Sequence, residues 1–335
     1  MVPTQPDEGV DQRFDVVTMG RVGVDLYPLR TGVGLEDVES FGRFLGGSPT
    51  NVAIAAARHG HRTAVITKTG DDPFGRYVHR ALGEFGVDDR FVGTSADLPT
   101  PITFCEIFPP DDFPLYFYRF PKAPDLDIRP EELDFDAIRA AKVFWVTVTG
   151  LCQEPSRSAT LAALQARSEF LAREGASGIT VLDLDYRPMF WDSPETARAW
   201  VQRALPHVTV AVGNREECEV AIGAHDTPAA AALALREAGA RLAVVKQGPK
   251  GVLALDDTGQ VEVPPVPVEV VNGLGAGDAF GGALVHGLLE GWDLERTVRF
   301  ANAAGAIVAG ALACSSAMPT ESEVEQKLKE TASAA

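Results

Sequence analysis

The segment 272–280, with the sequence NGLGAGDAF, combines bare backbone with a single carboxylate. Phe280, Leu284 and Leu288 follow at helical spacing, which predicts a glycine loop that runs directly into a helix. The first turn of a helix presents unpaired N–H groups and the positive end of the helix dipole, and missing side chains let a ligand approach closely. The segment therefore predicts a binding site for an anion such as a phosphate.

Asp278 lies at the mouth of this predicted anion site, and two roles suit it. It could simply cap the helix. Alternatively, it could accept the proton of an attacking hydroxyl, while the amides of Gly275, Ala276 and Gly277 hold the charge that develops on a transferring phosphoryl group. The second interpretation predicts a kinase of small hydroxylated molecules.

A second glycine site, Gly46-Gly47, precedes an alanine-rich stretch that predicts another helix. Ser48 suits the N-cap and Pro49 the first helical position, so Asn51 would point from the first turn toward whatever the two glycines admit. An ordinary strand-to-helix turn explains the same residues.

Asp25 is expected just past the carboxyl end of a predicted first strand at 14–20. Asp185 and Arg187 follow the predicted strand 179–183 in the same way. Ligands bind at the carboxyl ends of strands in open parallel sheets, which makes these side chains candidates for a site. For Asp25, a solvated turn aspartate is the structural alternative.

The elements that must position these residues alternate between strands and helices along most of the chain. Buried strands are predicted at 14–20, 63–67, 143–148, 179–183, 208–212 and 242–246. This rhythm predicts an α/β fold, a doubly wound, mostly parallel sheet with helices on both faces, in one domain over 14–320. An aromatic hairpin at about 100–120 interrupts the rhythm and is expected to form a small β lid with 28–45. The ends, 1–12 and 331–335, are predicted to be flexible.

Composition limits the partners of the chain. Its 335 residues carry 47 acids against 30 Lys and Arg, a net charge of −17, which argues against nucleic acid. An anionic ligand would need local Arg, Lys, Mg²⁺ and backbone amides. No apolar run is long enough to cross a membrane, no signal peptide is evident, and the four cysteines form no CxxC motif, so we expect a cytoplasmic protein.

Two motifs, taken together, resemble the ribokinase-like (PfkB) carbohydrate kinases over roughly residues 14–320. They are GGSPTN at 46–51, with its alanine-rich helix and GDDPFG at 70–75, and GAGDAF at 275–280. The resemblance implies ATP and Mg²⁺ as cosubstrates, γ-phosphate transfer to a sugar hydroxyl, and Asp278 as the catalytic base. Potassium activation stays open, because residues 272–274 are Asn-Gly-Leu where many relatives have Asp-Thr-Thr, whose acid helps them bind a monovalent cation.

The resemblance also assigns expected contacts to residues of this sequence. Glu217 is expected to support Mg²⁺ through water, although Asn214 and Glu217 also form a capping-box pattern that explains them structurally. The expected nucleotide contacts are Asn214, Lys246, Gly248, Gly251, Gly275, Gly277 and Asn302. The expected sugar contacts are Asp25, Gly46, Gly47 and Asn51.

Arg119 and Arg187 resemble the arginines that kinases of keto-deoxy sugar acids place against the substrate carboxylate. A sugar acid is therefore the expected substrate, with a neutral sugar such as fructose as an alternative. Arg119 could instead be a surface charge. A sugar-binding regulator without catalysis is a further alternative, which the intact segment 275–278 argues against. The exposed edges of a β lid suggest a homodimer formed through it.

Overall fold

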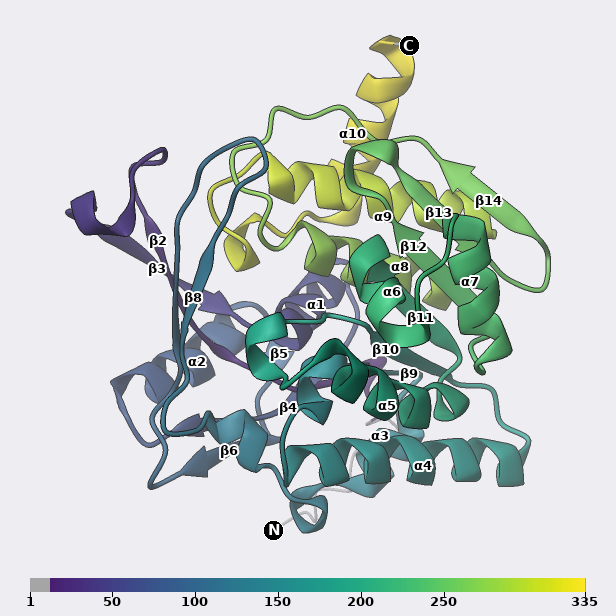
Figure 1. Cartoon of the computed structure of the whole chain (residues 1–335), viewed down its shortest axis with the longest axis horizontal. Helices are drawn as coiled ribbons and strands as arrows, with labels where there is room; N and C mark the ends of the chain where they lie inside the picture. The colour runs from purple at the N-terminus through teal and green to yellow at the C-terminus, as the bar shows by residue number, and fades with distance from the viewer. Residues whose placement is uncertain (1–12, 335) are drawn as a thin grey trace, which may run out of the picture.

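The computed structural model describes residues 13–334, and its centre is a large, mostly parallel β-sheet (Figure 1). The strand order is β14-β13-β12-β11-β10-β9-β1-β4-β5, with β6 beside β4. β13 runs antiparallel to both of its neighbours, β12 and β14, and the other described pairs of this sheet are parallel. The strands are β1 Val16–Met19, β4 Thr63–Gly70, β5 Val87–Asp88, β6 Val92–Ser95, β9 Val143–Thr147, β10 Ile179–Asp183, β11 Val210–Asn214, β12 Leu242–Lys246, β13 Val252–Leu255 and β14 Gln260–Val263.

Helices cover both faces of this sheet, because the central strands are Val-rich and buried on both sides. One core packs the sheet against α4, α5, α6 and α7, and the other packs it against α1, α8 and α9. The predicted doubly wound α/β fold is therefore confirmed. The helices are α1 Ser48–Arg58, α2 Pro73–Glu84, α3 Phe135–Ala140, α4 Ser156–Glu174, α5 Pro194–Ala204, α6 Arg215–Ile222, α7 Pro228–Glu237, α8 Ala276–Leu289, α9 Leu294–Ala309 and α10 Glu321–Ala334.

A second, four-stranded sheet stands beside the large one, at the left of Figure 1. Its order is β3-β2-β7-β8, formed by β2 Gly23–Pro28, β3 Phe41–Gly46, β7 Ile102–Cys105 and β8 Leu115–Tyr118. The aromatic hairpin predicted at 100–120 is the antiparallel pair β7–β8. Asp25, expected just past the carboxyl end of the first strand, lies instead within β2, because the backbone of residues 23–28 pairs with both β3 and β7.

Local sequence signals predicted where two helices, α6 and α1, begin. The prediction is confirmed for α6 and is wrong by one residue for the N-cap of α1. Asn214 and Glu217 form the predicted capping box, with 2.9 Å from the Glu217 amide to Asn214 Oδ1 and 2.7 Å from the Asn214 amide to Glu217 Oε2. Helix α1, however, begins at Ser48, so Gly47 and not Ser48 is the N-cap. Gly47 has φ 106°, and a Cβ there would lie 2.3 Å from the Arg21 carbonyl oxygen, so the position requires glycine.

Flexible segments were predicted at both ends of the chain. The predicted flexible segment 1–12 lies outside the described residues. The predicted flexible end at 331–335 is helical as far as Ala334, because α10 continues to that residue. No helix in the described part of the chain has the length and hydropathy required to cross a bilayer.

Candidate active site

A cavity of about 260 Å³ lies at the carboxyl ends of the central strands, with the small sheet on one side. Three neighbouring strands end there in polar residues: Asp183 closes β10, Asn214 closes β11 and Lys246 closes β12. This is the position at which open parallel sheets bind ligands. The lining residues are Arg21, Asp25, Tyr27, Gly47, Ser48, Asn51, Thr103, Leu115, Phe117, Asp183, Asp185, Arg187, Asn214, Glu217, Lys246, Gly273, Leu274, Gly275, Gly277, Asp278 and Cys314.

The predicted glycine loop enters α8 at the edge of this cavity. Gly275 is the N-cap, with φ 80°, and a Cβ there would lie 2.7 Å from Cys314 Sγ. A Cβ on Gly277 would lie 3.3 Å from Lys246 Nζ. The absence of side chains thus leaves the first-turn amides of α8 next to an ammonium group, an arrangement suited to a polyanion.

Asp278, in the first turn of α8, faces the start of α1 across the cavity. Asn51 Nδ2 donates a hydrogen bond of 2.8 Å to Asp278 Oδ2. Burial raises the pKa of Asp278 above its ordinary value, although hydrogen bonds from Asn51 and Ser48 oppose the shift. A carboxylate with a raised pKa binds a proton more readily, which suits a general base.

Acidic side chains at the strand ends surround the only lysine of the cavity lining. Burial lowers the pKa of the Lys246 ammonium, but the carboxylates around it, foremost Asp183 and Glu217, raise it above its ordinary value. Burial raises the pKa of Asp183 to about 7, even though Lys246 opposes the shift. The cavity therefore holds a protonated lysine and an excess of carboxylates, a set of hard oxygen ligands that suits Mg²⁺.

Two arginines converge on Asp185, whose side chain is only 3% exposed. Arg187 Nη2 lies 2.7 Å from Asp185 Oδ1, and Arg21 Nη2 lies 3.4 Å from Asp185 Oδ2. The Arg21 guanidinium also lies 5.6 Å from the centre of the Phe117 ring. Two fixed guanidinium groups in one cavity can hold a carboxylate of a ligand.

The small sheet supplies the opposite side of the cavity. Asp25 on β2 accepts a hydrogen bond of 2.9 Å from the Tyr27 hydroxyl. Burial raises the pKa of Asp25 to about 6, against the effects of Tyr27 and Arg21. Gly46 does not line the cavity, but a Cβ there would lie 2.2 Å from Asp25 Oδ1, so this glycine makes room for the carboxylate.

Several predicted site residues lie outside the cavity lining. Arg119 is the clearest case. Arg119 Nη2 donates a hydrogen bond of 2.6 Å to Asp125 Oδ2, and both side chains are buried. The Asn302 side chain on α9 donates a hydrogen bond of 2.8 Å to the Pro264 carbonyl oxygen. The others outside the lining are Gly46, Ala276, Gly248 and Gly251, the last two in the turn that follows Lys246.

The sequence-based predictions missed several residues that do line the cavity. Asp183 carried a usable signal, because it ends a strand next to those that end in Asn214 and Lys246. Arg21 lies close behind the end of β1, where a site residue could have been predicted. Thr103 comes from β7 and Cys314 from the segment after α9, and no local sequence pattern marked either as a site residue.

Comparisons with known proteins agree with this geometry. The pfkB family carbohydrate kinase model matches residues 13–321. A 5-dehydro-2-deoxygluconokinase of Geobacillus kaustophilus is 33% identical over 322 residues, which cover 95% of this chain and 94% of that protein.

Two solved structures extend the comparison. A PfkB protein from Polaromonas sp. JS666 aligns with a TM-score of 0.79 at 26% identity, covering 93% of this chain and 99% of that one. An uncharacterized sugar kinase from Pyrococcus horikoshii, in complex with ATP, aligns with a TM-score of 0.76 at 25% identity. The alignment covers 94% of this chain and 99% of that one. The chain belongs to the pfkB family of carbohydrate kinases, enzymes that transfer phosphate to an alcohol group of a sugar.

Proposed function

We propose that this chain transfers the γ-phosphate of ATP to the 6-hydroxyl of 5-dehydro-2-deoxy-D-gluconate, a step of myo-inositol catabolism. The observation that carries the proposal is that Asp278, the first-turn amides of α8 and the two arginines Arg21 and Arg187 share one cavity. The name of the Geobacillus relative supports the choice of substrate.

Asp278 is the proposed base of this reaction. Its carboxylate takes the proton of the 6-hydroxyl, the hydroxyl oxygen attacks the γ-phosphorus, and the bond from that phosphorus to the ADP oxygen breaks. Asn51 holds the carboxylate in place through its 2.8 Å hydrogen bond. The amides of Gly275, Ala276 and Gly277 stabilise the charge that develops on the phosphoryl oxygens.

The residues at the strand ends fit a nucleotide and a magnesium ion. Lys246 supplies a positive charge beside the amides of Gly277 and its neighbours, and Glu217 supplies a carboxylate for Mg²⁺, which when bound neutralises phosphate charge. Asn214 orients Glu217 through the capping box. Gly248, Gly251 and Asn302 stay predicted nucleotide contacts.

Asp25, Gly47 and Asn51 are the proposed partners of the sugar hydroxyls, since they come from the side of the cavity formed by β2 and the start of α1. Arg187 is the proposed clamp for the sugar carboxylate, with Arg21 beside it. Two guanidinium groups offset the negative charge of the cavity, which would otherwise repel an acid.

An ADP-release assay coupled to NADH oxidation tests the proposal. The panel is 5-dehydro-2-deoxygluconate, 2-dehydro-3-deoxygluconate, fructose and ribose, each with ATP and Mg²⁺, in KCl and in NaCl. We expect the highest kcat/KM with 5-dehydro-2-deoxygluconate. A preference for fructose or ribose would overturn the sugar-acid proposal, and a preference for 2-dehydro-3-deoxygluconate would replace the substrate but keep the clamp.

The potassium arm of this assay addresses residue 272. The Asn272 side chain is fully buried. It donates a hydrogen bond of 2.8 Å to the Leu312 carbonyl oxygen and accepts one of 3.0 Å from the Leu274 amide. Since these bonds use both ends of its carboxamide, we expect equal rates in the two salts.

We further propose that residues 14–320 form one kinase domain with the small sheet as its lid, and that two chains pair through this sheet. Support comes from large side chains of the sheet and its flanks that stay exposed: Tyr116 at 45%, Tyr118 at 61%, Phe120 at 80% and Leu29 at 57%. β8 is also an edge strand. Light scattering should give twice the chain mass, and a monomer mass would contradict the pairing.

A further inference from the structure

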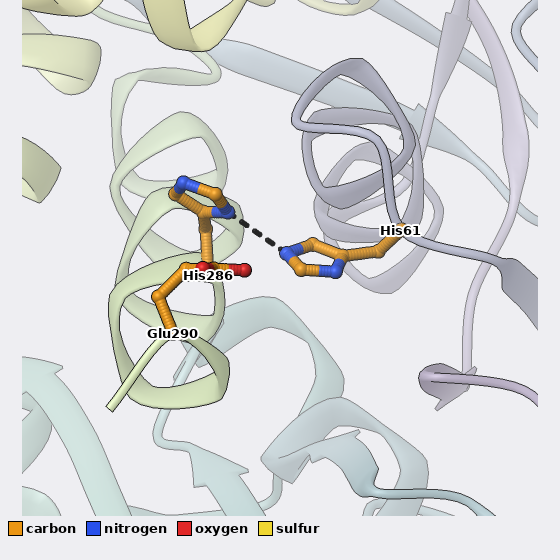
Figure 2. A group of neighbouring side chains, drawn as sticks. All are labelled: His61, His286 and Glu290. Carbon is orange, nitrogen blue, oxygen red and sulfur yellow. Dashed lines mark hydrogen bonds between the residues drawn. The ribbon is translucent and has the colours of Figure 1, made fainter. Parts of the chain in front are cut away.

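Two histidines from distant parts of the sequence meet at the end of the α1–α8 helix pair that is remote from the cavity (Figure 2). His61 follows α1 by a few residues, and His286 lies in the last turn of α8. Their ring nitrogens, His61 Nε2 and His286 Nδ1, are 2.9 Å apart. Glu290, at the C-cap of α8, lies below the same gap.

The donor atoms of these three residues are close enough to share one ion. One ligand atom from each of His61, His286 and Glu290 lies within 4.8 Å of the others. Zinc holds imidazole nitrogens at about 2.0–2.1 Å, so two of them in a tetrahedral site stand about 3.4 Å apart. The histidines would therefore separate by only a few tenths of an ångström to admit an ion.

The packing around His286 fixes the ring. His59 stacks on it with 4.9 Å between ring centres, and Trp292 meets it edge-on at 5.0 Å. His286 Nε2, the nitrogen that faces away from His61, lies 3.8 Å from Glu321 Oε2. This distance is longer than a hydrogen bond, and the nitrogen has no hydrogen-bond partner among the described residues, so packing against His59 and Trp292 is what holds the ring.

The electrostatic surroundings favour a cation at this place. The carbonyl end of α8 carries partial negative charge, and both Glu290 and Glu321 are adjacent. Metals bind the neutral form of imidazole, which an ordinary histidine mostly adopts at about pH 7.

We propose that His61, His286 and Glu290 form a binding site for a divalent transition-metal ion, with Zn²⁺ as the best match and water as the fourth ligand. Two nitrogens and one carboxylate select Zn²⁺, Ni²⁺ or Cu²⁺ over Mg²⁺, which takes oxygen ligands. The site is thus chemically distinct from the carboxylate-rich cavity.

The position of the site links it to the proposed catalytic residues. The first turns of α1 and α8 carry Asn51 and Asp278 at the cavity, and His286 lies about 12 Å along α8 from Asp278 at 1.5 Å per residue. A bound ion would tie the C-terminal end of α8 to the segment after α1. It would therefore stabilise the helix pair without contact to substrate.

Zinc binding to the full chain tests the proposal. Chelator-treated protein is dialysed against ZnCl₂ with excess Mg²⁺ present to compete at the cavity, and Co²⁺ absorption reports on the ligand set. We expect His61→Asn to bind one Zn²⁺ fewer per chain, or to bind that ion at least about tenfold more weakly, and Glu290→Gln to weaken it as well. His225→Asn, far from this cluster in the sequence and bonded to the Gly223 carbonyl, is the matched control.

Two further readouts keep the outcome decisive. ZnCl₂ should raise the Tm of the wild-type chain and of His225→Asn but not of His61→Asn. The Co²⁺ form should show the intense visible bands of a tetrahedral site in the wild type and in His225→Asn but not in His61→Asn. If wild type and His61→Asn bind the same number of zinc ions with the same affinity, the two rings form only a hydrogen-bonded pair and the proposal is wrong.

Discussion

The Asn51 carboxamide on α1 donates a 2.8 Å hydrogen bond to the Asp278 carboxylate on α8, across 227 positions of sequence. The close packing of these helices makes this contact possible. Gly281 and Gly282 let α8 approach α1 so closely that added Cβ atoms would lie 3.2 Å from Val52 Cγ2 and 2.3 Å from Ala55 Cβ. The amide therefore orients the proposed base from a second, rigid helix.

Replacement of the proposed base tests its role directly. Asp278→Asn keeps the shape of the side chain but cannot accept the hydroxyl proton, so we expect kcat to fall by roughly 10²–10⁴ with little change in sugar affinity. Steady-state kinetics and a sugar-binding titration measure the two quantities. Asp97→Asn, at an exposed position, is the control. Turnover near the wild-type value would exclude Asp278 as the base.

Removal of the orienting amide should change the pH profile of the reaction. The Asn51 hydrogen bond favours the ionised form of Asp278 and lowers its pKa. In Asn51→Ala that pKa rises, and because the base must be ionised, the acid limb of the kcat/KM profile should move to higher pH. An acid limb at the wild-type pH, with kcat reduced throughout, would mean that Asn51 acts only on position.

The two cavity arginines should govern affinity for the sugar acid. A hydrogen bond to a charged group contributes about 1.5–3 kcal/mol, so Arg187→Gln or Arg21→Gln should raise the KM for the acid about 10- to 100-fold. The KM for ATP should change much less. Arg80→Gln, whose side chain is 63% exposed, is the control. An unchanged KM in both variants would leave the carboxylate without a clamp in this cavity.

Arg119 is expected to stabilise the fold. Its partner Asp125 has a side chain only 3% exposed, so Arg119→Ala leaves a buried charge unpaired and should cost about 3–5 kcal/mol in the free energy of unfolding. Denaturant unfolding measures this, and Asp125→Ala in the same chain should recover part of the loss. Arg90→Ala breaks an exposed pair with Asp88 and should leave the free energy of unfolding almost unchanged.

The Arg119→Ala variant separates two interpretations of this residue. A clamp on the substrate carboxylate, the sequence-based hypothesis, predicts a raised KM for the acid and little loss of stability. The pairing with Asp125 predicts the reverse.

Asp25 should make stability depend on pH. Its folded-state pKa of about 6 lies above the 3.8 of an ordinary aspartate, so the folded chain holds this proton more tightly than the unfolded chain. The free energy of unfolding therefore falls as the pH rises from about 4 to about 6, and the cost is complete above that range. Asp25→Asn removes the cost, so its Tm should exceed that of the wild type at pH 8 and match it near pH 4. A Tm difference independent of pH would contradict this.

The amino-acid sequence by itself determined the architecture and the reactive loop. Valine-rich runs, the glycines before α8 and the Asn214–Glu217 capping box act through neighbours in the chain, so their structures follow from local spacing. Family resemblance then predicted the kinase class from two short motifs.

Only the tertiary structure decided which side chains meet. It brings Arg21 and Arg187 onto Asp185, turns Arg119 toward Asp125, places Asp25 within a strand of the small sheet, and joins His61 to His286. The reason is physical: the direction and depth of a side chain depend on strand pairing and helix packing between distant segments, and local spacing carries no information about those partners.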